Sequence, residues 1–174
     1  MLHLHPEFLA KNPLGRALEK KRNQLYSGSS TPLDESVIEL LKKLRKQRDA
    51  IHEENPIRAR TMRTFVCGLH ESLKHIKADN VKCIVLARNI DAEITSAISL
   101  FHSLREECLS RGIPIVHAST KRLLSRALEK FPYTNVVALL HFQGFEELYR
   151  DMIQLWKCSD SHIHYHKDQT SLFA

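Results

Sequence analysis

The sequence lacks several features that mark membrane, metal-binding and nucleotide-binding proteins. It has no apolar run near the ~20 residues that a membrane-spanning helix needs. The four cysteines are widely spaced and form no Cys-x-x-Cys pair, which argues against a zinc ribbon. The five glycines form no Gly-rich phosphate loop after an apolar strand. We therefore expect no membrane partner, no metal and no cofactor.

A catalytic constellation is also missing. No histidine, cysteine or carboxylate stands at a spacing that marks a nucleophile–base pair, so an enzyme is the least favoured class. Three alternating histidines in residues 162–166 would share a strand face and could bind a metal, but such terminal runs are more often incidental. Residues 1–7 form no basic-then-apolar signal peptide, and three cysteines lie in apolar segments, as reduced thiols do. We expect a cytoplasmic protein, with the nucleus as a second location.

Positive charge is what the sequence does have. Among 174 residues, 26 Lys and Arg stand against 20 Asp and Glu, giving a formal net charge of +6, and 43% of residues are hydrophobic. This length and composition predict one folded domain with extensions. A basic balance favours polyanionic partners, although proteins that bind no nucleic acid share it.

Composition divides the chain into four segments. Residues 1–30 are weakly patterned and end in a Ser/Gly stretch, which predicts a flexible arm. Residues 31–54 predict an N-terminal helical extension, because they begin with a capping threonine and a proline. Residues 55–157 are expected to form the main domain, and residues 158–174 a tail.

The helical extension has a basic outer side. Its cations are Lys42, Lys43, Arg45, Lys46 and Arg48. We expect one apolar stripe of this helix to pack on the domain while the rest faces water, since charge at helical spacing usually means solvation. The second explanation for these cations is contact with the phosphate groups of a ligand.

Strand and helix patterns alternate in the second half of the chain. Apolar runs predict strands over residues 81–87, 113–117 and 136–142, and an amphipathic stretch after each predicts a helix. This alternation favours parallel crossovers. The predicted fold is of the α/β class, a three-layer α/β/α sandwich with an N-terminal helical extension.

A strand end, a glycine and an amphipathic helix follow one another over residues 65–77. Apolar side chains share one stripe of the helix, and His70, Lys74 and Lys77 lie together beside it, with Glu71 on their far side. This places hydrogen-bonding and charged groups near the helix N-terminus, where backbone amides favour anions. Gly68 either makes the turn from strand to helix or allows a ligand to approach the backbone. An ordinary solvated helix face also explains the charges.

This stretch resembles the signature of the kink-turn RNA-binding superfamily of ribosomal and snoRNP proteins, Gly-x-Asn-Glu-x-x-Lys. Gly68, Glu71 and Lys74 match three of its four marked positions, and His70 stands at the asparagine. The flanks look like one branch, the proteins that bind the selenocysteine insertion sequence (SECIS), in which that asparagine is already replaced. The resemblance covers about residues 55–156 and implies the superfamily's three-layer fold.

A second segment carries the resemblance further. Residues 120–127 look like the superfamily's Ser-Lys-x-x-Leu-Gly-Arg-Ala, with Lys121 and Arg126 at its basic positions. Ser125 replaces the glycine, and serine tolerates fewer backbone conformations. The loop at residues 131–135 corresponds to the apolar recognition loop that receives an extruded nucleotide.

The resemblance implies a role for each matched residue. Glu71 would accept hydrogen bonds from guanines that a kink-turn exposes at its sheared G·A pairs. His70 would contact a base edge or phosphate, and Lys74 and Lys121 would act as cations toward the RNA. Close backbone approach would occur at Gly68.

The remaining implied contacts are apolar or electrostatic. The extruded base would contact the loop through Phe131, Pro132, Tyr133 and Thr134. The candidate phosphate contacts are Arg58, Arg60, Arg63 and Arg126, because guanidinium groups suit phosphate, although a solvated face explains the first three as well.

The implied function is recognition of a kink-turn-like SECIS hairpin in selenoprotein mRNA, which supports recoding of UGA to selenocysteine. The implied partners are that RNA, the ribosome and the selenocysteine-specific elongation factor. Two alternatives stay open. One is a ribosomal or snoRNP protein that binds kink-turn RNA, and the other is a protein-interaction domain of the same fold without RNA binding.

Overall fold

The computed structural model of the protein describes residues 30–90, 95–131 and 133–159, without the side chains of residues 95–98. Almost all of the predicted arm, Pro132 of the recognition loop and the tail histidines lie outside the described residues.

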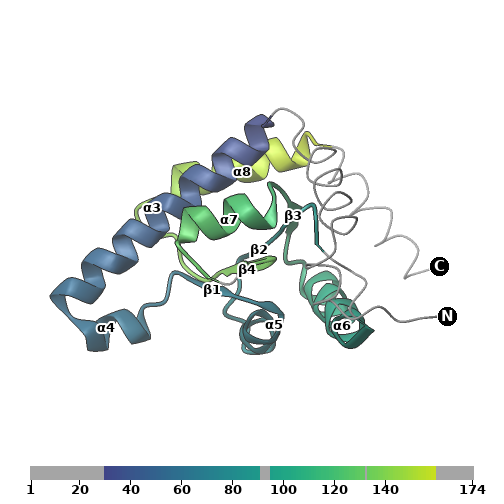
Figure 1. The fold of residues 1–174 in the computed structure, drawn as a ribbon, viewed down its shortest axis with the longest axis horizontal. Coiled ribbons are helices and arrows are strands. Elements are labelled where there is room, and N and C mark those ends of the chain that lie inside the picture. The colour runs from purple at the N-terminus through teal and green to yellow at the C-terminus, as the bar shows by residue number, and fades with distance from the viewer. Residues whose placement is uncertain (1–29, 91–94, 132, 160–174) are drawn as a thin grey trace, which may run out of the picture. The chain divides into compact units, whose positions relative to one another are not determined.

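Two consecutive helices begin the described part of the chain, and strands and helices alternate after them (Figure 1). In order they are α3 (Pro32–Glu54), α4 (Pro56–Thr61), β1 (Phe65–Cys67), α5 (Leu69–Lys77), β2 (Cys83–Leu86), α6 (Thr95–Arg111), β3 (Ile115–His117), α7 (Lys121–Leu128), β4 (Val136–Leu139) and α8 (Glu146–Lys157). None of these helices is both long and apolar enough to cross a membrane.

The start of α3 confirms the predicted cap. The Thr31 hydroxyl accepts a hydrogen bond from the Asp34 amide at 3.2 Å, and the Asp34 carboxylate accepts one from the Thr31 amide at 3.0 Å. This reciprocal pair satisfies two helix-end amides, and Pro32 follows at the first helical position, where its missing N–H costs nothing.

The four strands form one mixed sheet in the order β1-β4-β2-β3. β2 and β3 are parallel, while β4 is antiparallel to both β1 and β2. The prediction of parallel crossovers is therefore right for β2 and β3 and wrong for β4. Val136, the first residue of β4, pairs with Leu86, the last residue of β2. β3 also ends there, so α7 and the loop after it bring the chain back to the edge of the sheet at which β3 ended.

Helices cover both faces of the sheet, which confirms the predicted three-layer sandwich (Figure 1). Side chains of β2 alternate between the two cores, as a period of two requires: Cys83 and Val85 join the core beneath α3, α7 and α8, while Ile84 and Leu86 join the core beneath α5 and α6. α3 packs on α7 and α8 and supplies five buried apolar core residues, Leu33, Val37, Leu40, Leu41 and Leu44. The division of the chain into four segments stays a prediction.

Candidate RNA interface

Most of the predicted contact residues lie at one edge of the sheet. β1, β2 and β3 all end at the edge where β4 begins. Backbone hydrogen bonds join the connections there: the Gly68 amide donates to the Val136 carbonyl at 2.9 Å, and the Ala87 amide donates to the Asn135 carbonyl at 2.9 Å. The start of α5, the start of α7 and the loop before β4 therefore meet at this edge.

Gly68 starts α5 in a backbone conformation that suits only glycine, with φ +97° and ψ 154°. A Cβ placed on it would meet nothing within 4 Å, so the strand-to-helix turn and not close packing inside the protein requires the glycine. The open space also leaves the backbone reachable from outside. Gly68 provides no side-chain cap, so the first-turn amides of α5 keep their affinity for an anion.

The polar face of α5 is exposed beside this turn. His70, Glu71 and Lys74 all lie in solvent, while Ser72 and Ile76 are fully buried on the opposite side. Among the described residues, Glu71 makes no ion pair and no hydrogen bond. Its carboxylate is therefore available to a ligand at the helix N-terminus.

Lys121 reaches the same edge from the start of α7. The side-chain oxygen of the buried Asn89 accepts a hydrogen bond from the Lys121 amide at 2.8 Å, and the Thr120 hydroxyl caps the helix by accepting from the Leu123 amide at 3.4 Å. Thr120 is thus the N-cap of α7. Lys121 itself is half-buried.

Ser125 fixes the recognition loop to α7. Its hydroxyl donates to the Lys121 carbonyl at 2.7 Å and accepts from the Thr134 amide at 2.6 Å. Phe131 is 92% exposed and Tyr133 56% exposed, so the loop presents aromatic surface to solvent. Thr134 was predicted with them but is only 7% exposed, because it anchors the loop.

The structure does not bring all predicted arginines to this edge. Arg58 and Arg60 lie on α4 and Arg63 follows it, so all three precede β1, which begins at the opposite edge of the sheet. They are exposed. Arg126 is also exposed, on the far half of α7, where it lines a groove against α3.

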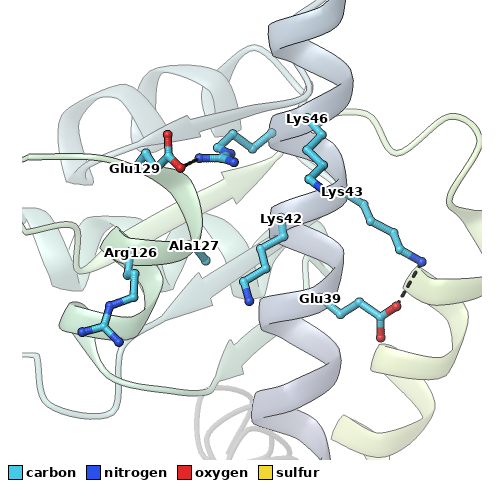
Figure 2. A pocket seen from close by; sticks show the side chains of 8 residues that line it. Glu39, Lys42, Lys43, Lys46, Arg126, Ala127 and Glu129 are labelled. Carbon is cyan, nitrogen blue, oxygen red and sulfur yellow. Dashed lines mark ion pairs between the residues drawn. The ribbon is translucent and has the colours of Figure 1, made fainter.

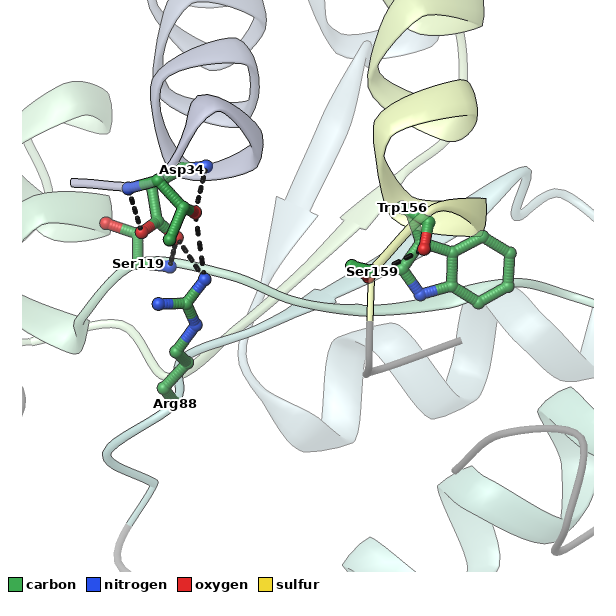
Figure 3. A network of polar contacts seen from close by, with 6 residues as sticks. Asp34, Arg88, Ser119, Trp156 and Ser159 are labelled. Carbon is green, nitrogen blue, oxygen red and sulfur yellow. Dashed lines mark hydrogen bonds and ion pairs between the residues drawn. The ribbon is translucent and has the colours of Figure 1, made fainter. Parts of the chain in front are cut away.

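Sequence reasoning missed an ionic network around the buried Asp34 beside the site (Figure 3). Asp34 is 6% exposed, and its carboxylate accepts from the Ser119 amide at 2.5 Å and from the Arg88 guanidinium at 2.9 Å. Ser119 has a φ of +61°, a strained value that this contact holds in place. The Asp34–Ser119 contact joins residues 85 positions apart. The capping pattern at Thr31 indicated only the start of the helix to which Asp34 belongs.

His117 ends β3 at the same edge. Burial lowers the pKa of its imidazole, and the positive charges of Arg105 and Arg88 lower it further. The imidazole is therefore neutral at neutral pH and adds no charge to the interface.

Comparison with known proteins agrees with this architecture. The family model described as the ribosomal protein L7Ae/L30e/S12e/Gadd45 family matches residues 49–149, more than half of the chain. The chain belongs to this family. The L7Ae-family match begins near the end of α3, so most of that helix lies outside the match. The helix nevertheless contributes side chains to the core.

Two curated relatives of this L7Ae-family chain are SECIS-binding proteins. Selenocysteine insertion sequence-binding protein 2 of Rattus norvegicus is 29% identical over 128 residues, which is 72% of this chain and 15% of the relative. Selenocysteine insertion sequence-binding protein 2-like of Mus musculus is 30% identical over 143 residues, which is 79% of this chain and 13% of the relative. The chain thus spans about a seventh of their length.

A solved structure shares the fold. The 15.5kD RNA binding protein of Giardia lamblia matches with a TM-score of 0.54 and 15% identity, covering 76% of this chain and 93% of that protein. This agreement supports the L7Ae-type arrangement of helices around a four-stranded sheet.

Proposed function

We propose that the protein binds kink-turn RNA at this sheet edge, and that its ligand is the SECIS hairpin of selenoprotein mRNA. The observation that carries the proposal is the exposed Glu71 carboxylate, which has no partner among the described residues and lies at the start of α5 beside Gly68. The names of the curated relatives support SECIS as the RNA. Support of UGA recoding in the cytoplasm, with the ribosome and the selenocysteine-specific elongation factor as partners, belongs to the same proposal.

Glu71 would provide the specificity. In this proposal its carboxylate accepts hydrogen bonds from guanine N–H groups at the sheared G·A pairs. A base without those donors leaves the buried acceptor unpaired, which costs about 1–3 kcal/mol. Lys74 and Lys121 neutralise the phosphates that approach with the base, and His70 contacts a neighbouring base edge or phosphate.

The aromatic loop would receive a base. Phe131 and Tyr133 present surface on which an extruded nucleotide stacks, as single-stranded bases commonly do on aromatic side chains. The hydrogen bond from the Thr134 amide to Ser125 keeps the loop at a fixed distance from α7.

A titration tests the role of Glu71. We expect the wild type to bind a SECIS hairpin more tightly than the same hairpin with its G·A pairs replaced by Watson–Crick pairs. Glu71→Gln should reduce that preference by roughly 10–100-fold, because the side chain loses its charged acceptor. Affinity is measured by fluorescence anisotropy at fixed salt, since phosphate contacts make it salt-dependent.

Glu147→Gln on α8 is the matched control, because it removes an exposed carboxylate from another helix. A preference that survives in the Glu71 variant would contradict the assigned role. If both hairpins bind equally weakly to the wild type, the chain is a protein-interaction domain instead.

The family description, which names ribosomal proteins, favours one second candidate, a ribosomal or snoRNP RNA as ligand. Crosslinking in the native cell followed by RNA sequencing separates the two. Selenoprotein messages among the crosslinked RNAs would support the SECIS ligand, and an excess of rRNA or snoRNA would support the alternative.

A further inference from the structure

A cationic groove runs between α3 and α7, apart from the sheet edge (Figure 2). Its volume is about 280 Å³. Five cationic and two acidic side chains line it, leaving three positive charges in excess. Ala127, which is almost fully buried, is the other residue in the lining.

The excess charge lies on three cations. Lys43 pairs with Glu39 at 3.0 Å, and Arg45 pairs with Glu129, so the acids of the groove are already used. The remaining lining cations are Lys42, Lys46 and Arg126. They are exposed and have no ion pair or hydrogen bond within the described part of the chain.

These three cations come from two helices. Lys42 and Lys46 stand one turn apart on α3, and Figure 2 shows Lys42 extending toward the side of α7 that carries Arg126. A set of like charges gathered across a helix pair, with no acids left to balance it, favours an anionic ligand over simple solvation.

The groove lies near the C-terminal half of α7, and the N-terminus of the same helix lies at the sheet edge. Lys121 begins that helix and Arg126 lies five residues later, about 7 Å along its axis at ~1.5 Å per residue. Five residues also turn the helix about 140° past one full turn, so Lys121 and Arg126 lie on different faces of α7. An RNA held by its kink at Lys121 would therefore reach Arg126 and the lysines of α3 through a stem that passes alongside the helix.

We propose that this groove binds the phosphate backbone of an RNA stem adjoining the kink, a second contact that rests on the proposed function. An acidic protein surface fits less well, because protein interfaces use buried aromatic or aliphatic anchors and the lining offers only Ala127. Lysine ammonium groups bind phosphates as point charges and require no base sequence.

Two RNAs and one triple variant test the groove. The short RNA keeps the kink with the fewest flanking base pairs that fold, and the long RNA, made in two versions, extends either stem by one helical turn. For the long RNA that reaches the groove, we expect Lys42→Gln with Lys46→Gln and Arg126→Gln to weaken binding about tenfold. The salt dependence should flatten by about one unit of log–log slope per lost contact. Binding of the short RNA should not change.

The matched control removes two exposed lysines and one exposed arginine elsewhere, through Lys82→Gln, Lys157→Gln and Arg150→Gln. It should leave the difference between long and short RNA intact. Circular dichroism checks that both triple variants fold. The inference is overturned if the groove variant loses no affinity for either long RNA, if it weakens short and long RNA equally, or if the control has the same effect.

The two proposals fail in different ways. If the wild type recognises the kink in the short RNA but gains nothing from either extended stem, the groove inference falls and the proposed function stands. If the wild type shows no preference for the kink, both fall. The remaining outcome is a groove variant that loses the wild type's binding to polyglutamate and still binds long RNA as the wild type does. That result would assign the groove to an acidic protein and overturn the inference.

Discussion

Ser125 shows at the scale of one residue how a departure from a family pattern becomes a structural contact. The superfamily that the sequence resembles has glycine at this position, and a glycine can mark a backbone conformation that other residues rarely adopt. Ser125 is not among the residues with positive φ, so it is an ordinary helical residue. Its hydroxyl holds the Thr134 amide, a contact that glycine cannot make.

Replacing this serine should loosen the recognition loop. In Ser125→Ala the buried Thr134 amide loses its acceptor, which should lower the free energy of unfolding by about 1–3 kcal/mol. Hydrogen exchange of the Thr134 amide should accelerate, since exchange reports local opening. Ser110→Ala, which removes an exposed hydroxyl from α6, should have a much smaller effect on stability. Unchanged exchange at Thr134 would show that the loop does not depend on Ser125.

The positions of the candidate contact residues at a helix start were predictable, because these residues stand in short local motifs. Glu71 and Lys74 follow Gly68 at helical spacing, and the strand-to-helix turn places them at an exposed helix start. Burial of Thr134 was not predictable, because it depends on a hydrogen bond from another element. Periodicity says which face of an element is apolar but not which loop residue is held inside.

At the scale of elements, α3 is tied to the candidate interface through Asp34. Its carboxylate holds the Ser119 amide, and Arg88 joins the same network just before Asn89, which holds the Lys121 amide. A helix from the start of the described chain thereby helps to position a residue of the site. No sequence pattern encodes such a contact, because its partners lie far apart along the chain.

Removing this charge should affect stability and RNA binding together. Asp34→Asn loses an ionic acceptor while Arg88 and the Ser119 amide still need one, so urea unfolding should show a loss of about 1–3 kcal/mol. Because the same network supports the start of α7, affinity for a SECIS hairpin should also fall. Asp49→Asn, half exposed on the same helix, should cost less than about 1 kcal/mol. RNA affinity equal to that of the wild type would limit Asp34 to a structural role.

The whole molecule combines one predictable feature with one that sequence patterns do not contain. Alternating apolar runs and amphipathic stretches were enough to predict the layers, since each element must bury its apolar face. Strand direction was not encoded in them, because a buried strand has the same apolar pattern in either direction. The antiparallel insertion of β4 between β1 and β2 therefore emerged only from the structure.

The stability of the whole fold should depend on pH through His117. Its folded-state pKa is lowered by burial and by nearby arginines, so the unfolded chain binds the proton more readily. This stabilising contribution is present above the unfolded pKa of about 6.5 and is lost as pH falls from there toward the folded pKa, by up to ~1.4 kcal/mol per pH unit. Urea unfolding at neutral and mildly acidic pH measures the loss.

His117→Gln should reduce this acid-induced loss, because the variant has no titrating group at that position. The comparison is the drop in unfolding free energy between the two pH values, taken within each protein. A variant that loses as much as the wild type would assign the pH dependence to other groups.

The core contribution of α3 also bears on how the protein can be cut into working pieces. A fragment designed from the family match would start at residue 49 and leave behind all five apolar side chains that this helix buries. Their uncovered counterparts on α7 and α8 would then face water and promote aggregation. The smallest soluble recombinant piece should therefore start no later than Thr31, well upstream of the border that family likeness suggests.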